Sequence, residues 1–228
     1  MKVINFFGAP SAGKTTATSG LHYEMKKRWI NVEIVQEYAK ELLLMRMAHR
    51  LSDQMKIFAE QRERLERNLG KTQVAISESP LILSSFYIPP SYPDSFFQMT
   101  FDFFHTYDNI NFFINRSHSY SDNNRVQNEA QSDYIAKVMK EFLQYANIPY
   151  YEITASDANP RYLLYWLVQK NLIEVPDFAS IFSDQDIPPE GWIKPSPWNP
   201  NLQAKHGLID LKAREVVKDI VRLPQEEV

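Results

Sequence analysis

FFGAPSAGKTTAT, residues 6–18, joins an apolar run to a loop of small residues and then to a lysine and two threonines. Within it, Gly8-x-x-x-x-Gly13-Lys14-Thr15 matches the phosphate-binding loop (P-loop) pattern, in which glycines let successive backbone N–H groups point inward at an anion. The apolar run before the loop and the helical pattern after it supply the strand and the helix that a P-loop requires. The stretch therefore predicts a nucleotide-binding site, against the alternative of an ordinary glycine-rich turn.

Each part of this loop has a predicted role. The helix that follows presents its unpaired N–H groups and the positive end of its dipole to the phosphates. Lys14 is expected to reach the β- and γ-phosphates, and the Thr15 hydroxyl is expected to hold Mg²⁺. The predicted cofactors are ATP and Mg²⁺. The predicted nucleotide-binding residues of the loop are Gly8, Ala9, Pro10, Ser11, Ala12, Gly13, Lys14, Thr15 and Thr16.

Strand-like and helical patterns alternate along most of the chain. Apolar runs typical of short buried strands occur at residues 2–7, 32–38, 73–77, 110–115 and 150–154. Helical patterns occur at residues 15–29, 38–47, 53–69, 93–106, 129–145, from 159 onward, and at 207–221. This alternation predicts an α/β fold: a P-loop three-layer sandwich with a five-stranded, mainly parallel sheet and helices on both faces, plus a C-terminal arm.

The amino-acid composition changes in the last quarter of the sequence, where prolines become frequent. We expect residues 1–170 to form the P-loop domain, with a lid at about 116–128, and residues 171–228 to form a C-terminal extension. Trp192 and Trp198 in this extension are costly to expose, so we expect it to pack on the core or on a partner subunit. Packing on the core is the expectation, and a homodimer formed through the arm is the alternative.

Composition narrows the functional classes. The 228 residues carry a net charge of −3, which disfavours capture of nucleic acid by overall charge but leaves a local basic patch open. The absence of cysteine excludes disulfides, thiolate metal sites and cysteine nucleophiles. No apolar run approaches the roughly 20 residues needed to cross a bilayer. We expect a cytoplasmic protein without a membrane partner.

Two acidic residues follow predicted strands, where ligands bind in sheets of this kind. Glu37 ends the second strand-like run, and Glu78 directly follows the third. Phosphoryl transfer needs an acceptor hydroxyl in line with the γ-phosphate and a carboxylate that takes its proton. Glu37 suits this catalytic role. Glu78 suits the same role, or binding of Mg²⁺ directly or through water; the alternative for each is a structural or solvated glutamate.

Four stretches fall in the order and spacing of a family of small kinases: GAPSAGKTT, VQEYAKEL, IFAEQRERLERNLGK and ISESPLILSSFY. Over roughly residues 1–166 the chain resembles nicotinamide riboside kinase domains and, more closely, related P-loop kinases encoded by bacteriophages. The resemblance implies a kinase acting in the cytoplasm, that of the host for a phage protein. The family usually places aspartate at the position of Glu78, which favours a water-bridged metal contact here. Deoxynucleoside kinases also place a glutamate after the second strand, which supports Glu37 by analogy.

A polar segment with two arginines precedes the helical pattern at 129–145. In small kinases a lid at this place closes over the triphosphate, and its arginines neutralise the transferring group. The phage kinases keep an arginine followed two residues later by a glutamine, here Arg125 and Gln127. We predict that Arg125 stabilises the transition state and that Arg116 contacts nucleotide phosphate or adenine. A solvated loop is the alternative.

The sequence favours a nucleoside, nucleotide or nucleotide-like acceptor but does not identify it. Arg46, Arg50 and Gln61 are candidates for contacts to an acceptor phosphate. One variant is a kinase that phosphorylates the hydroxymethyl group of a modified pyrimidine in phage DNA. The non-kinase alternative is a nucleotide-dependent ATPase switch or binding module; a GTPase is disfavoured because the chain lacks an NKxD tetrapeptide.

Overall fold

The apolar run that leads into the P-loop forms a central strand, β1 (Lys2–Phe7), in a computed structural model that describes residues 1–121, 127–157, 159–175, 182–197 and 212–217. Its side chains alternate between two buried clusters. Ile4 and Phe6 pack in one cluster, and Val3 and Phe7 pack in the other. Because both faces of the strand are covered, the run is almost continuously apolar instead of alternating with exposed polar residues.

Five parallel strands and one short antiparallel strand form the sheet. Their order is β2 (Val32–Val35), β3 (Val74–Ser77), β1, β4 (Asp108–Asn115), β5 (Tyr151–Thr154) and β6 (Lys194–Pro195). The predicted α/β sandwich is confirmed. The sheet has six strands, not five, because β6 comes from the C-terminal arm, and its Lys-Pro sequence carries no strand signature.

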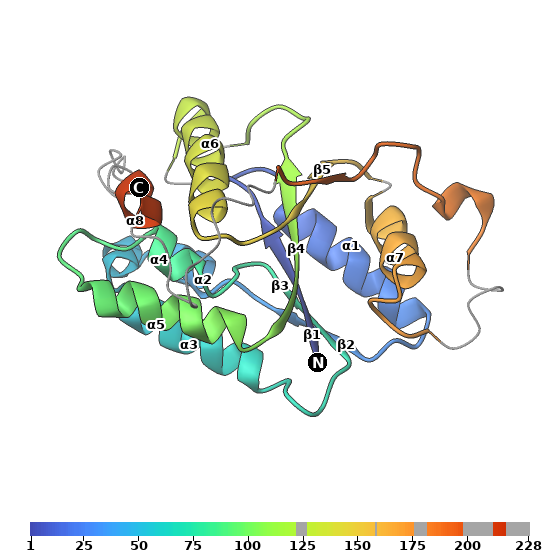
Figure 1. The fold of residues 1–228 in the computed structure, drawn as a ribbon, viewed down its shortest axis with the longest axis horizontal. Helices are drawn as coiled ribbons and strands as arrows, with labels where there is room; N and C mark the ends of the chain where they lie inside the picture. The colour runs from blue at the N-terminus through green and yellow to red at the C-terminus, as the bar shows by residue number, and fades with distance from the viewer. Residues whose placement is uncertain (122–126, 158, 176–181, 198–211, 218–228) are drawn as a thin grey trace.

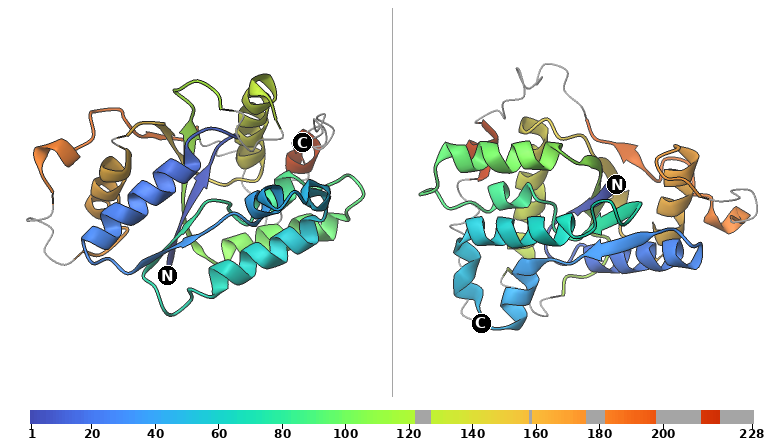
Figure 2. Two further views of the ribbon diagram at one scale, coloured as in Figure 1. Left: turned by 180° about the vertical axis from the view of Figure 1, so that it is seen from behind. Right: turned by 90° about the horizontal axis from the view of Figure 1, so that it is seen from below.

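Helices cover both faces of the sheet (Figures 1 and 2). On one face lie α1 (Lys14–Lys27) and α7 (Asn159–Gln169). On the other lie α3 (Gln54–Glu66), α4 (Leu83–Phe86), α5 (Asp94–His105), α6 (Glu129–Tyr145) and α8 (Lys212–Val217). None of the helices in the described ranges combines the length and the apolar character that a bilayer span needs.

The helical pattern predicted over 38–47 is interrupted in the structure. Helix α2 (Tyr38–Leu44) ends early because Arg46 adopts a left-handed φ of 56°. The N–H of Met47 donates to the carbonyl of Leu42 at 2.7 Å, which closes the last turn. A short 3-10 helix, η1 (Ala48–Ser52), then leads to α3.

Parts of the C-terminal arm lie on the core of the same chain. β6 pairs with β5, and the Ser196 N–H donates to the carbonyl of Tyr150 at 2.8 Å. The Trp192 Nε1–H donates to Oδ1 of Asn159 at 3.1 Å, which ties the arm to the start of α7. Helix α8 packs on α6.

Some predictions about the arm fall outside the described residues. Within the helix predicted at 207–221, the structure describes only the α8 segment, and Trp198 also lies outside. The homodimer through the arm stays a prediction.

The topology brings the predicted acids to the P-loop. The carboxyl ends of parallel strands lie at one edge of a sheet, and the P-loop follows β1 at that edge, with β3 on one side and β4 on the other (Figure 1). Glu78 directly follows β3, and Glu37 comes two residues after β2. The candidate site is therefore built at this edge.

Candidate functional site

The P-loop curls through backbone conformations that favour glycine. The φ angle is 147° at Gly8, 61° at Ser11 and 89° at Gly13. A Cβ added to Gly8 would lie 2.9 Å from the carbonyl oxygen of Ile114 in β4, closer than real Cβ atoms approach. Gly8 is therefore required both by its φ angle and by the neighbouring strand.

The N-terminus of α1 is open toward the loop. Gly13 is its N-cap residue; within the described part of the chain no side chain caps this end and no acid lies in its first turn. Lys14 Nζ donates to the carbonyl oxygens of Gly8 at 2.8 Å and Ala9 at 2.9 Å. The first-turn N–H groups, the helix dipole and the ammonium group together form a cradle whose chemistry fits a polyphosphate.

The tip of the loop is held by the segment that follows β4. The Ser132 hydroxyl, buried on α6, donates to the carbonyl of Pro10 at 2.8 Å. The Ser11 hydroxyl accepts from the N–H of Ser121 at 3.0 Å. Helix α6 is itself fixed by a capping box between Asn128 and Gln131. Ser132 carries no sequence motif and is identified by its tertiary contact alone.

A cavity of about 670 Å³ lies beside the first turn of α1. It is lined by Gly13 and Thr16, by Ser117 and His118 after β4, and by the turn 155–157 before α7. This volume lies within the roughly 300–1,000 Å³ of small-molecule pockets. The cavity therefore borders the phosphate cradle and has the size of a small-molecule pocket.

The Glu78 carboxylate is buried, with a relative exposure of 6% for the residue. Among the described residues, none donates a hydrogen bond or pairs with this carboxylate. A carboxylate at a largely buried position is normally paired or bound to a metal, so Glu78 suits a bound cation. Its oxygens and the Thr15 hydroxyl are hard ligands that suit Mg²⁺.

The described residues contain no group of three or more His, Cys, Asp or Glu that could hold a metal. This agrees with the way Mg²⁺ is bound beside phosphates, with few protein ligands and several waters or phosphate oxygens. Thr15 and Glu78 therefore fit the predicted metal role, which stays a prediction.

Glu37 is half-buried and forms the N-cap of α2. It lies near Tyr87, at the end of α4: burial and the charge of Glu37 both raise the pKa of Tyr87 well above its ordinary value. Tyr87 therefore remains a neutral phenol, able to donate a hydrogen bond at this side of the site. The sequence analysis included Tyr87 only as the last residue of a family-like stretch.

Gln61 fixes the backbone on both sides of Glu37. Its side chain donates to the carbonyl of Gln36 at 3.1 Å and accepts from the N–H of Tyr38 at 3.0 Å. The prediction that Gln61 contacts an acceptor phosphate is wrong, because the residue is 3% exposed and its amide is used by these two bonds. Gln61 is instead a positioning residue for Glu37.

Arg64 holds the next turn of α2. Its guanidinium donates to both carboxylate oxygens of Glu41, at 2.5 and 2.6 Å, and lies over the ring of Tyr38. This hydrogen bonding holds the pKa of Glu41 below its ordinary value. Because the pKa is lower in the folded state, the pair stabilises the fold at neutral pH, and this contribution is lost as the pH falls through the unfolded and then the folded pKa.

We expect Arg64→Met to lower the free energy of unfolding by about 0.5–1 kcal/mol at neutral pH, since the pair is partly exposed and screened by solvent. We also expect the variant to lose less stability than wild type between about pH 5 and pH 3. Denaturant unfolding at several pH values measures both. Arg67→Met is the matched control. Arg67 also lowers the pKa of a carboxyl group, that of Glu63, but this pair is fully exposed to the solvent, whereas the Arg64–Glu41 pair is partly buried. Equal acid slopes for wild type and Arg64→Met would contradict the expectation.

Of the two arginines predicted in the lid, the structure describes Arg116 but not Arg125. Arg116 donates to Glu129 at 2.9 Å and also pairs with Asp133, and its guanidinium lies over the Tyr120 ring. These contacts tie the end of β4 to α6 and engage the guanidinium with two carboxylates. Its predicted contact with nucleotide stays a prediction. Arg125 lies outside the described residues, and its predicted catalytic role also stays a prediction.

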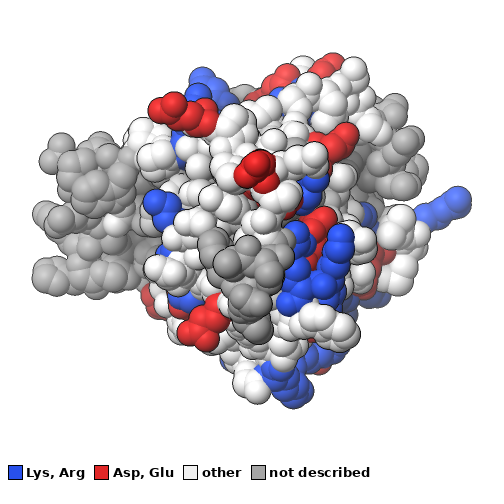
Figure 3. Space-filling model, turned by 90° about the vertical axis from the view of Figure 1, so that its right-hand side faces the viewer, with Lys and Arg blue, Asp and Glu red and all other residues white. Residues whose placement is uncertain are grey.

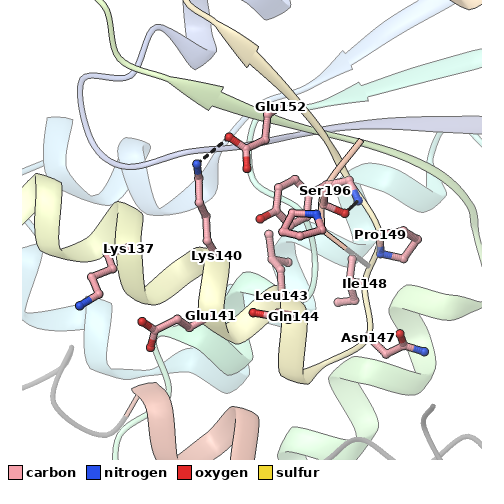
Figure 4. Close-up of a pocket in the computed structure, with 12 residues that line it drawn as sticks. Lys137, Lys140, Glu141, Leu143, Gln144, Asn147, Ile148, Pro149, Glu152 and Ser196 are labelled. Atoms are coloured by element: carbon pink, nitrogen blue, oxygen red, sulfur yellow. Dashed lines mark hydrogen bonds and ion pairs between the residues drawn. The ribbon is translucent and has the colours of Figure 1, made fainter. Parts of the chain in front are cut away.

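A second, smaller cavity of about 220 Å³ lies between α6 and the β5–β6 edge (Figure 4). Lys140 donates to Glu152 at 2.7 Å across it, and Asn115 donates to the same carboxylate at 3.0 Å. These bonds join α6, β4 and β5. No P-loop residue lines this cavity, so it is separate from the candidate site.

Comparison with known proteins agrees with this geometry. No curated protein matches the chain significantly. A family model described as an AAA domain matches residues 3–161, which include the P-loop, both acids and the whole parallel part of the sheet. On this match the chain belongs to the AAA domain family of P-loop proteins.

Proposed function

We propose that the protein is an ATP-dependent kinase that transfers the γ-phosphate to a hydroxyl group of a nucleoside, a nucleotide or a nucleotide-like acceptor. The observation that carries this proposal is the positioning of Glu37 at the sheet edge that holds the P-loop. Gln61 bonds to the backbone on both sides of it, and Tyr87 lies near it. A glutamate held in this way suits a base that acts on a bound alcohol.

The two halves of the site have separate roles in this proposal. The P-loop amides and Lys14 bind the phosphates, and the 670 Å³ cavity beside Gly13 receives the nucleoside part of ATP. When bound by Thr15 and Glu78, Mg²⁺ supplies charge neutralisation of the phosphates. Residues after β2 and β3 face the acceptor, on the other side of the loop from β4.

The chemical step follows from these roles. The acceptor oxygen forms a bond to the γ-phosphorus while the bond from that phosphorus to the β,γ-bridging oxygen breaks, which leaves ADP. The acceptor proton moves to the Glu37 carboxylate. The P-loop donors and Lys14 stabilise the negative charge that develops on the leaving phosphate.

The experiment that tests the proposal is an acceptor screen with labelled ATP and Mg²⁺, using nucleosides, mononucleotides and DNA that contains a hydroxymethyl pyrimidine. We expect label on at least one hydroxyl acceptor, and its loss on the order of 100-fold or more in Lys14→Ala. Lys27→Ala, an exposed lysine at the end of α1, is the matched control and should label as wild type does. Slow ATP hydrolysis that no acceptor changes would favour a switch instead.

The DNA arm of this screen tests for a polymer acceptor. On the side of the molecule that carries α7 and the 3-10 helix η3 (Asp184–Asp186), blue and red side chains lie interspersed (Figure 3). Among the described residues of that face, positive and negative charges are mixed, so it presents no continuous basic surface to a polyanion such as DNA. This face lies on the side of the sheet opposite β2 and β3, so the charge of the acceptor side is tested by the screen itself, where label on DNA alone would favour a polymer acceptor.

A further inference from the structure

Lys40 reaches the P-loop from the acceptor side. Its Nζ donates to the Thr15 hydroxyl oxygen at 3.3 Å, although the two residues come from α2 and α1. Lys40 lies three residues after Glu37, a spacing that puts both on one side of a helix. The ammonium is therefore next to the residue predicted to bind Mg²⁺.

Lys40 lies on α2, which side chains of α3 hold in place. Gln61 holds the backbone at the start of α2, and the Arg64–Glu41 pair holds the residue directly after Lys40. Lys40 is half-buried, so its side chain does not simply extend into solvent. The elements that position Glu37 thus also position this ammonium group.

No acid accounts for this placement. Across the described ranges, the Lys40 ammonium has no carboxylate partner, and its hydrogen bond goes to a neutral hydroxyl. Lys14 turns the other way and donates to Gly8 and Ala9 of its own loop. Two ammonium groups thus lie at the P-loop, and that of Lys40 has no anionic partner among the residues that the structure describes.

Binding of a metal by Thr15 conflicts with the observed contact. The hydroxyl oxygen that accepts from Lys40 is the atom that would bind the magnesium ion, and two cations on one oxygen repel each other. With a metal on Thr15, Lys40 would turn to an anion instead, and the terminal phosphate of a triphosphate would supply one beside the P-loop.

We propose that Lys40 binds the γ-phosphate of ATP and so distinguishes ATP from ADP. This inference rests on the proposed nucleotide site but not on the identity of the acceptor. In the transfer reaction the charge spreads over the equatorial oxygens of the γ-phosphoryl group, and a fixed ammonium stabilises that charge. Lys40 is in this role a catalytic residue as well as a sensor of the bound nucleotide.

Calorimetric titration of the full chain with Mg²⁺ and either ADP or a non-hydrolysable ATP analogue tests the proposal. In Lys40→Met we expect the triphosphate to bind about 10- to 100-fold more weakly, as expected for loss of a charge-assisted contact, with ADP affinity unchanged. Lys40→Arg keeps the charge and should restore most of the triphosphate affinity. Lys27→Met is the control and should bind both nucleotides as wild type does.

Two outcomes overturn the inference. Equal weakening of both nucleotides in Lys40→Met would give Lys40 a structural role in α2, and unchanged binding of both would remove it from the site. This result can be separated from the kinase proposal. If Lys40→Met loses the preference for the triphosphate but the wild-type protein labels no acceptor, the inference about Lys40 stands and the proposed function fails.

Discussion

Glu37→Gln is expected to reduce phosphoryl transfer by about 10²- to 10⁴-fold, the usual contribution of a positioned general base. The amide keeps the shape and hydrogen-bonding reach of the side chain but cannot take the acceptor proton. Binding of ATP with Mg²⁺ should change little, because the phosphates are held by the P-loop. Single-turnover transfer and equilibrium nucleotide binding measure the two effects separately.

Glu33→Gln is the matched control for this experiment. Glu33 lies on β2, four residues before Glu37, and pairs with Lys26 at 2.7 Å in a half-exposed ion pair. Its loss should leave transfer unchanged. Transfer that survives in Glu37→Gln at the wild-type rate would remove the base from the mechanism while leaving the P-loop assignment intact.

Gly8→Ala is expected to disrupt the phosphate cradle itself. At a φ of 147°, alanine is strained, and its Cβ would meet the Ile114 carbonyl oxygen at 2.9 Å. We expect a loss of about 3 kcal/mol in the free energy of unfolding. We also expect a loss of nucleotide affinity on the order of 100-fold, because displaced loop amides no longer match the phosphates. Denaturant unfolding and calorimetry measure these quantities.

Gly70→Ala separates backbone strain from collision. Gly70 also has a positive φ, 70°, but a Cβ there would meet nothing within 4 Å. We expect a cost of about 1–2 kcal/mol from the left-handed backbone alone, and unchanged nucleotide affinity. If the two alanine variants lose equal stability and bind nucleotide equally well, the close approach of β4 to the P-loop does not matter.

Local patterns predicted much of the fold because each carries its own physical signal. The helix predicted at 129–145 agrees with α6 at both ends, where the capping box between Asn128 and Gln131 fixes its start and the apolar residues keep a helical period. The P-loop is recognisable in the sequence because its backbone needs glycine at positions of positive φ, and Gly8 and Gly13 both have positive φ angles in the structure.

The partners of side chains that meet across the fold could not be predicted from the sequence. The charge of Arg116 was visible in the sequence, but its pairing with Glu129 and Asp133 depends on how α6 packs beside β4. Gln61 is a candidate for acceptor contact in the sequence because its helix borders the site, but its side-chain amide bonds to the backbone of Gln36 and Tyr38. Lys40 has one usable signal in the sequence, its place three residues after Glu37 in the first turn of the helix predicted at 38–47.

The strand β6 extends the structural unit beyond the segment that the family shares. The shared segment stops at residue 161, yet Tyr150 exchanges two hydrogen bonds with Ser196, at 2.8 and 3.2 Å. A chain shortened to the shared segment would leave the outer side of β5 unpaired, and an unpaired edge can recruit strands from other molecules and aggregate. Excision or transplantation of this domain therefore has to carry residues 182–197 with it.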